Sequence, residues 1–153
     1  MPRIAILLGS KSDLPFVDAA KSYLEYFNLE YDVQVSSAHR NPDKVSAFCR
    51  EAREKGYGAI IAAAGMAAHL AGAVAAHSTL PVLGVPLPGG VLDGVDALLS
   101  TVQMPAGVPV ATFAVGKAGM RNAVVFAAQL FSLTDESMAR RLKTFKESGS
   151  RLS

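Results

Sequence analysis

The chain has 153 residues, half of them apolar and 18% charged, with a formal net charge of +2. This length and apolar content predict a single globular domain over residues 1–153 and exclude a disordered chain. So small a net charge, without a basic run or basic residues interleaved with aromatic ones, argues against nucleic acid as a partner.

Targeting and membrane segments are not predicted either. The apolar run Ile4–Leu8 is too short for a signal peptide, and no cleavage pattern follows it. No stretch reaches the ~20 consecutive apolar residues that cross a bilayer. The alanine-rich residues 59–76 come nearest, but Gly65 and His69 interrupt them. The one cysteine, Cys49, cannot form an internal disulfide, which fits a reducing compartment. We therefore expect a cytoplasmic protein with no membrane segment.

Along the chain, the apolar pattern alternates between strands and helices. Continuous apolar runs closed by glycine, such as Ile4–Leu8 before Gly9, are typical of strands buried on both faces. The predicted strands are Ile4–Leu8, Tyr31–Val35, Gly58–Ala64, Val82–Val85 and Val108–Ala114. Helices are predicted after a cap at Ser12 or Asp13, after Pro42, near Ala67–Ala76 and at Val91–Thr101.

The last two predicted helices differ in how their apolar residues are distributed around the helix. Lys117–Leu133 is apolar on nearly every side, which is typical of a buried helix, and another subunit is one candidate for its burial partner. The final helix, residues 134–148, has Asp135 and Glu136 in its first turn, where the helix dipole favours acidic side chains. Its single apolar edge predicts packing on a neighbouring subunit.

Strands separated by helices predict an α/β fold. The expected architecture is a three-layer αβα sandwich around a parallel, five-stranded, flavodoxin- or Rossmann-like sheet. In such sheets ligands bind at the carboxyl ends of the strands. Small or polar residues follow the first three predicted strands, at Gly9–Asp13, Ser37–Arg40 and Gly65–Leu70. We expect these loops to form one composite site.

Each of these loops has a functional and a structural interpretation. Ser10, Ser12 and Asp13 open a helix, so they could cap it or could help to bind a phosphate. His39 could transfer protons near neutral pH, and Arg40 suits a carboxylate or phosphate, but local sequence also permits a structural pair. The small residues at 65–68 admit either a ligand or a tightly packed helix, and His69 shares that ambiguity.

Several other chemistries are not indicated. The histidines lack the spacing and the thiol or carboxylate neighbours of a zinc site, so no metal is expected. Cys49 lies on the apolar stripe of its helix and is expected to be buried and inert. No nucleophile elbow is present.

Taken together, the segments resemble the N5-carboxyaminoimidazole ribonucleotide mutase family of de novo purine biosynthesis. Short motifs spread over nearly the whole chain carry this resemblance. They are Gly9–Asp13, Ser37–Arg40 with Pro42, Ala67–Leu70, Pro81–Pro86, Gly94 with Asp96, Leu99-Ser100, Val102–Pro105, Pro109–Thr112, Gly116–Gly119 and Asn122-Ala123.

The resemblance implies an isomerase that removes CO2 from the exocyclic nitrogen of the substrate and returns it to ring carbon C4. It implies His39 as the acid–base residue and a homo-octamer with active sites at subunit interfaces. No cofactor or metal is implied. The expected substrate-binding residues are Ser10, Ser12, Asp13, Ser37, Arg40, Gly65, Ala68, His69 and Leu70. Of these, Ser10, Ser12, Asp13 and Arg40 would hold the ribose phosphate.

The sequence departs from the family pattern at three places. Met66 stands where glycine is common, Ala71 stands where proline is common, and Pro88–Gly90 replaces a Ser/Thr-like stretch.

Two alternative functions stay open. A related branch carboxylates aminoimidazole ribonucleotide directly with CO2, although Arg40 and the Ala68-His69-Leu70 sequence favour the mutase branch. The other alternative is a noncatalytic, flavodoxin-like module that binds a nucleotide or flavin phosphate.

Overall fold

The protein forms a five-stranded parallel sheet flanked by helices. A computed structural model describes residues 2–152. The strands are β1 (Arg3–Leu8), β2 (Glu30–Val35), β3 (Ala59–Gly65), β4 (Val82–Leu87) and β5 (Ala111–Thr112). Their order across the sheet is β2-β1-β3-β4-β5, and every neighbouring pair is parallel. The chain reverses its direction across the sheet between β1 and β3, which makes that position a topological switch point.

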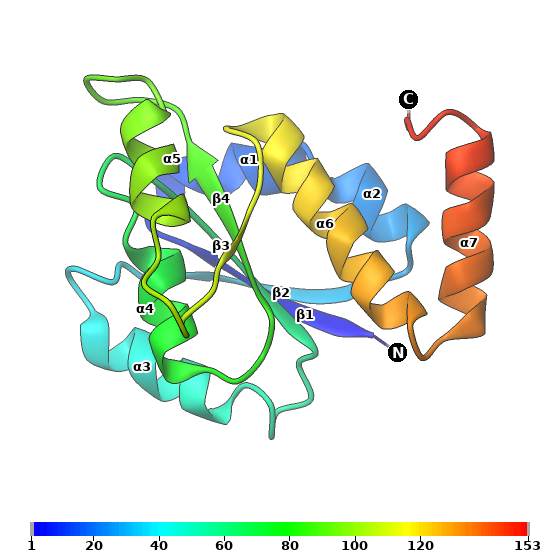
Figure 1. The fold of residues 1–153 in the computed structure, drawn as a ribbon, viewed down its shortest axis with the longest axis horizontal. Coiled ribbons are helices and arrows are strands. Elements are labelled where there is room, and N and C mark those ends of the chain that lie inside the picture. The colour runs from blue at the N-terminus through cyan, green and yellow to red at the C-terminus, as the bar shows by residue number, and fades with distance from the viewer. Residues whose placement is uncertain (1, 153) are drawn as a thin grey trace.

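Helices cover both faces of the sheet (Figure 1). They are α1 (Leu14–Asp18), α2 (Lys21–Tyr26), α3 (Pro42–Glu51), α4 (Leu70–His77), α5 (Val95–Val102), α6 (Lys117–Ser132) and α7 (Glu136–Glu147), with a 3-10 turn at Lys11–Asp13. None of the helices in the described part of the chain combines the length and hydropathy needed to span a bilayer.

Alternating strand residues build two cores. Ile4, Ile6 and Leu8 of β1 point to one face and pack with α1, α2, α6 and α7. Ala5 and Leu7 point to the other face and pack with α3 and α4. Because β1 is buried on both faces, its continuous apolar run has the composition expected for a central parallel strand. The predicted three-layer αβα architecture is confirmed.

Cys49 confirms the expectation of a buried, inert thiol. It lies on the inner face of α3 and is 2% exposed. Burial raises the pKa of this thiol to about 11, so the reactive thiolate is scarce at neutral pH.

The fifth strand is shorter than predicted. Residues 108–114 were expected to be extended throughout, whereas β5 pairs with β4 only at Ala111 and Thr112. Pro109 has no backbone N–H to donate, so regular pairing begins after it.

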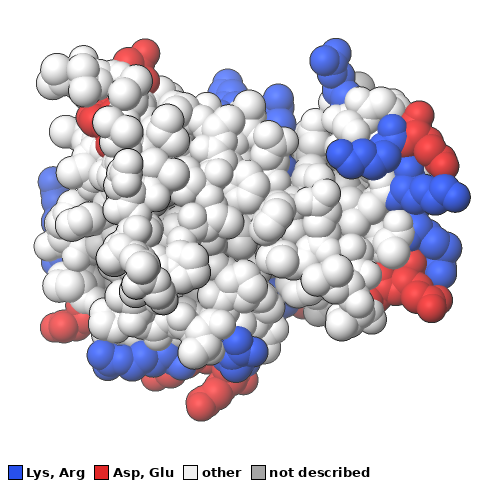
Figure 2. Space-filling model, in the orientation of Figure 1, with Lys and Arg blue, Asp and Glu red and all other residues white. Residues whose placement is uncertain are grey.

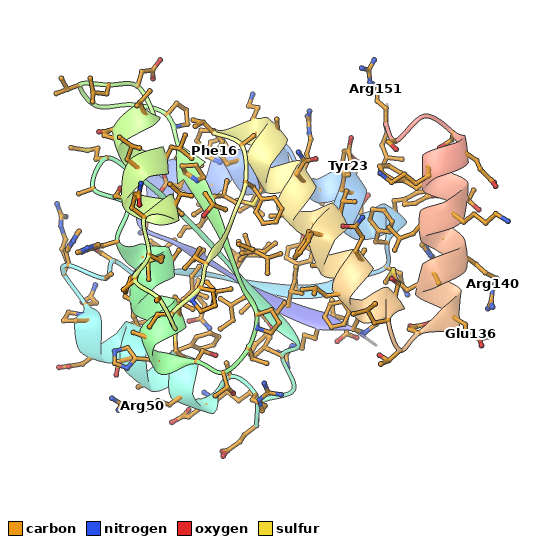
Figure 3. The ribbon with its side chains drawn as sticks, in the orientation of Figure 1. Phe16, Tyr23, Arg50, Glu136, Arg140 and Arg151 are labelled. Carbon is orange, nitrogen blue, oxygen red and sulfur yellow. The ribbon has the colours of Figure 1, made fainter. Side chains whose placement is uncertain are left out.

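Helix α7 packs with its apolar side on its own chain. Phe145 is buried, and its ring lies 5.2 Å from that of Phe27 and 6.0 Å from that of Tyr23. Figure 3 shows Glu136 and Arg140 on the outer side of α7, directed away from the rest of the chain. The apolar edge that was expected to meet a neighbouring subunit is thus covered by α2 and α6, whereas a contact through another face of α7 stays a prediction.

Candidate active site

A cleft of about 340 Å³ lies at the carboxyl ends of four strands, over the switch point between β1 and β3. Its lining residues come from the loops after β1, β2, β3 and β4. They are Gly9, Ser10, Ser12, Asp13, Ser37, Ala38, His39, Ala64–Ala67, His69, Leu70 and Pro88–Gly90. The composite site predicted from three loops is therefore assembled in the structure, and a fourth loop joins it.

The loop after β1 forms a capped polar turn. The Ser10 hydroxyl accepts a hydrogen bond from the Ser12 N–H and lies 2.9 Å from the Ser12 hydroxyl. The Ser10 N–H donates to the Asp13 carboxylate at 3.1 Å. Partial burial raises the pKa of the Asp13 carboxyl, and the hydrogen bond from Ser10 opposes that rise. Asp13 acts as a structural cap of this turn, and Ser10 and Ser12 both line the cleft.

Two histidines from different loops meet at this cleft. His39 follows β2, and His69 precedes α4. Nε2 of His39 lies 3.2 Å from Nδ1 of His69, and the centroids of the two rings are 5.2 Å apart. This hydrogen bond requires one ring nitrogen to donate and the other to accept, so the two rings cannot both be doubly protonated while it persists. The arrangement places two imidazoles, each able to donate or accept a hydrogen bond, next to a ligand-sized cleft.

Hydrogen bonds hold the histidine loops in place. The Arg40 N–H donates to the Ser37 hydroxyl at 3.2 Å, which closes the turn that carries His39. The Ala68 N–H donates to the Ser100 hydroxyl at 2.9 Å, and that hydroxyl donates to the Asp96 carbonyl at 2.7 Å. Ser100 on α5 therefore fixes the backbone just before His69, at a distance of 32 residues in sequence.

Arg40 lies at an adjoining hollow of about 350 Å³. Ser10, Ser37, His39 and Met66 line both spaces. A ligand in the cleft could therefore extend an anionic group toward the Arg40 guanidinium, which suits phosphate or carboxylate.

Both histidine side chains are exposed in the single chain, so the cleft is open rather than a sealed hollow. Among residues 2–152, no group of three or more His, Cys, Asp or Glu side chains is placed to hold a metal ion.

Most of the predicted site residues lie together. Ser10, Ser12, Asp13, Ser37, His39, Gly65, His69 and Leu70 line the cleft, and Arg40 lines the adjoining hollow. Ala68 is absent from both linings. It is buried, and it acts through its N–H to Ser100.

Met66 and Pro88–Gly90 also line the cleft. The sequence showed both as departures from the family pattern, and Met66 belongs to the Gly65–Leu70 loop, but neither was named among the substrate-binding residues. The support of Ala68 by Ser100 was not predicted. The signal for Pro88–Gly90 was available, because this loop follows the predicted fourth strand just as the other site loops follow theirs. Ser100 had no comparable signal, since a serine inside a predicted helix indicates no particular partner.

A larger hollow, of about 720 Å³, lies between α2 and α7. Glu25, Tyr26, Arg140 and Arg141 are among its lining residues, and it contains no histidine. We place the site in the smaller cleft because it occupies the switch point of the sheet and contains the histidine pair.

Comparison with known proteins identifies the family. The model of the AIR carboxylase family matches residues 3–151. The chain belongs to this family. It is 48% identical over 145 residues to the N5-carboxyaminoimidazole ribonucleotide mutase of Escherichia coli K12, an alignment that covers 95% of this chain and 86% of that protein. The mutase of Bacillus subtilis is 49% identical over 146 residues, with 95% and 90% covered.

Among solved structures, PurE of Treponema denticola superposes with a TM-score of 0.88 at 29% identity, covering 98% of this chain and 92% of that one. That solved structure thus has the same fold as this chain.

Proposed function

We propose that this protein converts N5-carboxyaminoimidazole ribonucleotide to 4-carboxy-5-aminoimidazole ribonucleotide in de novo purine biosynthesis. The observation that carries the chemistry is the His39–His69 pair, with ring nitrogens 3.2 Å apart at the cleft of the switch point. The shared name of the curated relatives supports the reaction itself.

In the proposed reaction, the bond between the carbamate carbon and the exocyclic nitrogen breaks, and CO2 leaves. The electron pair stays on nitrogen, which takes up a proton. Ring carbon C4 then forms a bond to the carbon of CO2 and loses its own proton, which restores aromaticity. One proton is used and one is released, so a single imidazole can serve both transfers. His39 has this role, because imidazole exchanges protons near neutral pH and His69 is its hydrogen-bonded partner.

Substrate binding is assigned to the polar loops around the pair. Ser10 and Ser12 offer hydroxyls to the ribose phosphate, together with the Asp13 turn and the Arg40 guanidinium. Ser37, Gly65, Ala68, His69 and Leu70 shape the end of the cleft that takes the base and carboxylate. Gly65 lines the cleft, and a Cβ there would lie 3.4 Å from the carbonyl oxygen of Leu87.

A direct assay tests the proposal against its alternatives. Purified protein is given the N5-carboxylated ribonucleotide in CO2-depleted buffer, and formation of the C4-carboxylated product is followed. A mutase converts it, whereas a direct carboxylase leaves it unconverted and works only when aminoimidazole ribonucleotide and CO2 are supplied. Tight binding without turnover of either substrate indicates the noncatalytic, nucleotide-binding module.

Arg40→Ala is expected to raise KM by about 10- to 100-fold, because a hydrogen bond to a charged group contributes about 1.5–3 kcal/mol. The value of kcat should change much less, since the guanidinium is assigned to the phosphate rather than to the reacting atoms. Steady-state kinetics measures both parameters. Arg50→Ala is the matched control, because Arg50 is an exposed arginine on α3 and does not line the cleft (Figure 3). An unchanged KM for Arg40→Ala refutes the contact.

The proposal includes a homo-octamer with active sites at subunit interfaces. Large apolar side chains are exposed on and before α5, including Val91 at 97%, Val95, Leu99 and Val102. Figure 2 shows few charges on the face that carries α5 and α6 and many on α7 and around the rim. A face with few charges and with exposed apolar residues, beside an open site, favours burial by another copy.

We also propose a cytoplasmic location, in keeping with the free thiol of Cys49.

Light scattering on the purified chain is expected to show one large assembly with the mass of an octamer. A stable, fully active monomer contradicts the interface-site proposal.

A further inference from the structure

Met66 has a conformation and an environment that a methionine does not favour. It is the first residue after β3, its φ is +56°, and it is 64% exposed. A left-handed backbone is unfavourable for residues with a Cβ, and exposure of a long apolar side chain provides no hydrophobic gain. Glycine would avoid both penalties. Neither backbone preference nor burial within the single chain therefore explains a methionine at this position.

The side chain of Met66 lies against the loop after β4. A Cβ added to Gly90 would lie 3.1 Å from Cγ of Met66, so the absence of a side chain at Gly90 makes room for the methionine. Gly90 has a φ of +71°, a conformation that glycine adopts readily. Met66 and Gly90 thus bring the loops after β3 and β4 together.

The contact between these loops lies at the edge of the cleft. Met66, Gly90, His39 and His69 all line the cleft, and Met66 also lines the hollow beside Arg40. Because Met66 lines both spaces and is largely exposed, its side chain lies at their edge. A flexible, apolar side chain can fill such a gap without offering hydrogen bonds to water.

We propose that Met66 is a retention-determining residue, whose side chain closes the side of the cleft next to the histidine pair and keeps released CO2 within reach of C4. This inference rests on the proposed mutase reaction. After the carbon–nitrogen bond breaks, CO2 is uncharged and weakly held, so it either bonds to C4 or escapes. Confinement favours bonding because a held partner reacts as part of the same complex. Escape leaves aminoimidazole ribonucleotide, with its nitrogen protonated, and CO2 in the medium.

The test follows a carbon label through the reaction. The substrate carries ¹³C in its carbamate, and the buffer contains unlabelled bicarbonate and carbonic anhydrase, which equilibrates any escaped CO2. An enzyme-free sample measures spontaneous loss. The wild-type protein is expected to keep most of the label in the product. Met66→Ala, which keeps the backbone restriction but truncates the side chain, is expected to lose several-fold more label and to accumulate aminoimidazole ribonucleotide.

Two further variants separate this role from a general effect. Met66→Leu restores an apolar side chain of similar size and is expected to recover most of the retention. Leu133→Ala removes an apolar side chain that is 81% exposed, at the end of α6 and outside the cleft, and is expected to match the wild-type protein.

The possible outcomes divide clearly. Label retention by Met66→Ala at the wild-type level overturns the inference while leaving the mutase reaction intact. A folded Met66→Ala protein that neither forms product nor releases labelled CO2 also overturns the inference. A folded Met66→Ala protein that forms no product but still releases labelled CO2 from the substrate supports the inference. Failure of the wild-type protein to convert the substrate rejects the proposed function instead.

Discussion

His39→Asn is expected to lower kcat by about 10²- to 10⁴-fold, the usual contribution of general acid–base catalysis. Asparagine is polar and smaller than histidine, so the loop and the cleft can keep their fold, but its amide is too short to replace Nε2 in the contact with His69. It cannot exchange a proton near neutral pH, so both proton transfers lose their carrier. Steady-state kinetics with the N5-carboxylated substrate should show a large fall in kcat with a small change in KM.

His77→Asn provides the matched control for this experiment. His77 is exposed at the end of α4 and does not line the cleft, so the same substitution there should leave kcat near the wild-type value. Circular dichroism should show that both variants are folded. A near-normal kcat for His39→Asn removes this residue from the acid–base role.

The sequence predicted the sheet and the place of the site because both depend on local patterns. Strands buried on two faces must be continuous apolar runs, as Ile4–Leu8 and residues 59–64 are. Each run ends at a small or polar residue, and the end of a parallel strand is where a ligand can approach. His39 and His69 were therefore assigned to the same edge, although 30 residues separate them.

Features that depend on distant contacts were not predictable in this way. The helix expected near Ala67 begins at Leu70, because Met66 turns the backbone into a left-handed conformation and Ser100 holds the Ala68 N–H outside the helix. Neither interaction has a local signature in the sequence. The apolar edge of α7 was a similar case, since periodicity shows that a face is apolar but does not identify the surface that covers it.

The approach of α6 to the site loops depends on Gly119. We expect Gly119→Ala to lower the free energy of unfolding by about 3 kcal/mol, which is at the upper end of the usual cost of overpacking. A Cβ at this position would overlap with the backbone carbonyl of Ala114, which cannot rotate away as a side chain can. The loop between β5 and α6 would have to shift. Urea unfolding followed by circular dichroism measures the change in the free energy of unfolding.

Gly72→Ala distinguishes this clash from the general effect of replacing a helical glycine. A Cβ at Gly72 would meet only the flexible end of Met104, at 3.3 Å from its sulfur. Alanine is favoured over glycine inside a helix by about 1 kcal/mol, so this variant should be at least as stable as the wild-type protein. Equal stability of the two variants would mean that the backbone around Ala114 can shift at little cost in free energy.

Loss of activity should accompany the loss of stability in Gly119→Ala. Gly116, at the start of α6, donates its N–H to the Pro86 carbonyl of β4 at 2.9 Å, and a Cβ there would lie 3.6 Å from the ring of Pro88. Displacement of this segment therefore moves the end of β4 and the loop that contains Gly90. Since Gly90 accommodates Met66, the disturbance reaches the mouth of the cleft. The rate of product formation per folded molecule should therefore be lower for Gly119→Ala than for Gly72→Ala, even in conditions where both proteins are fully folded.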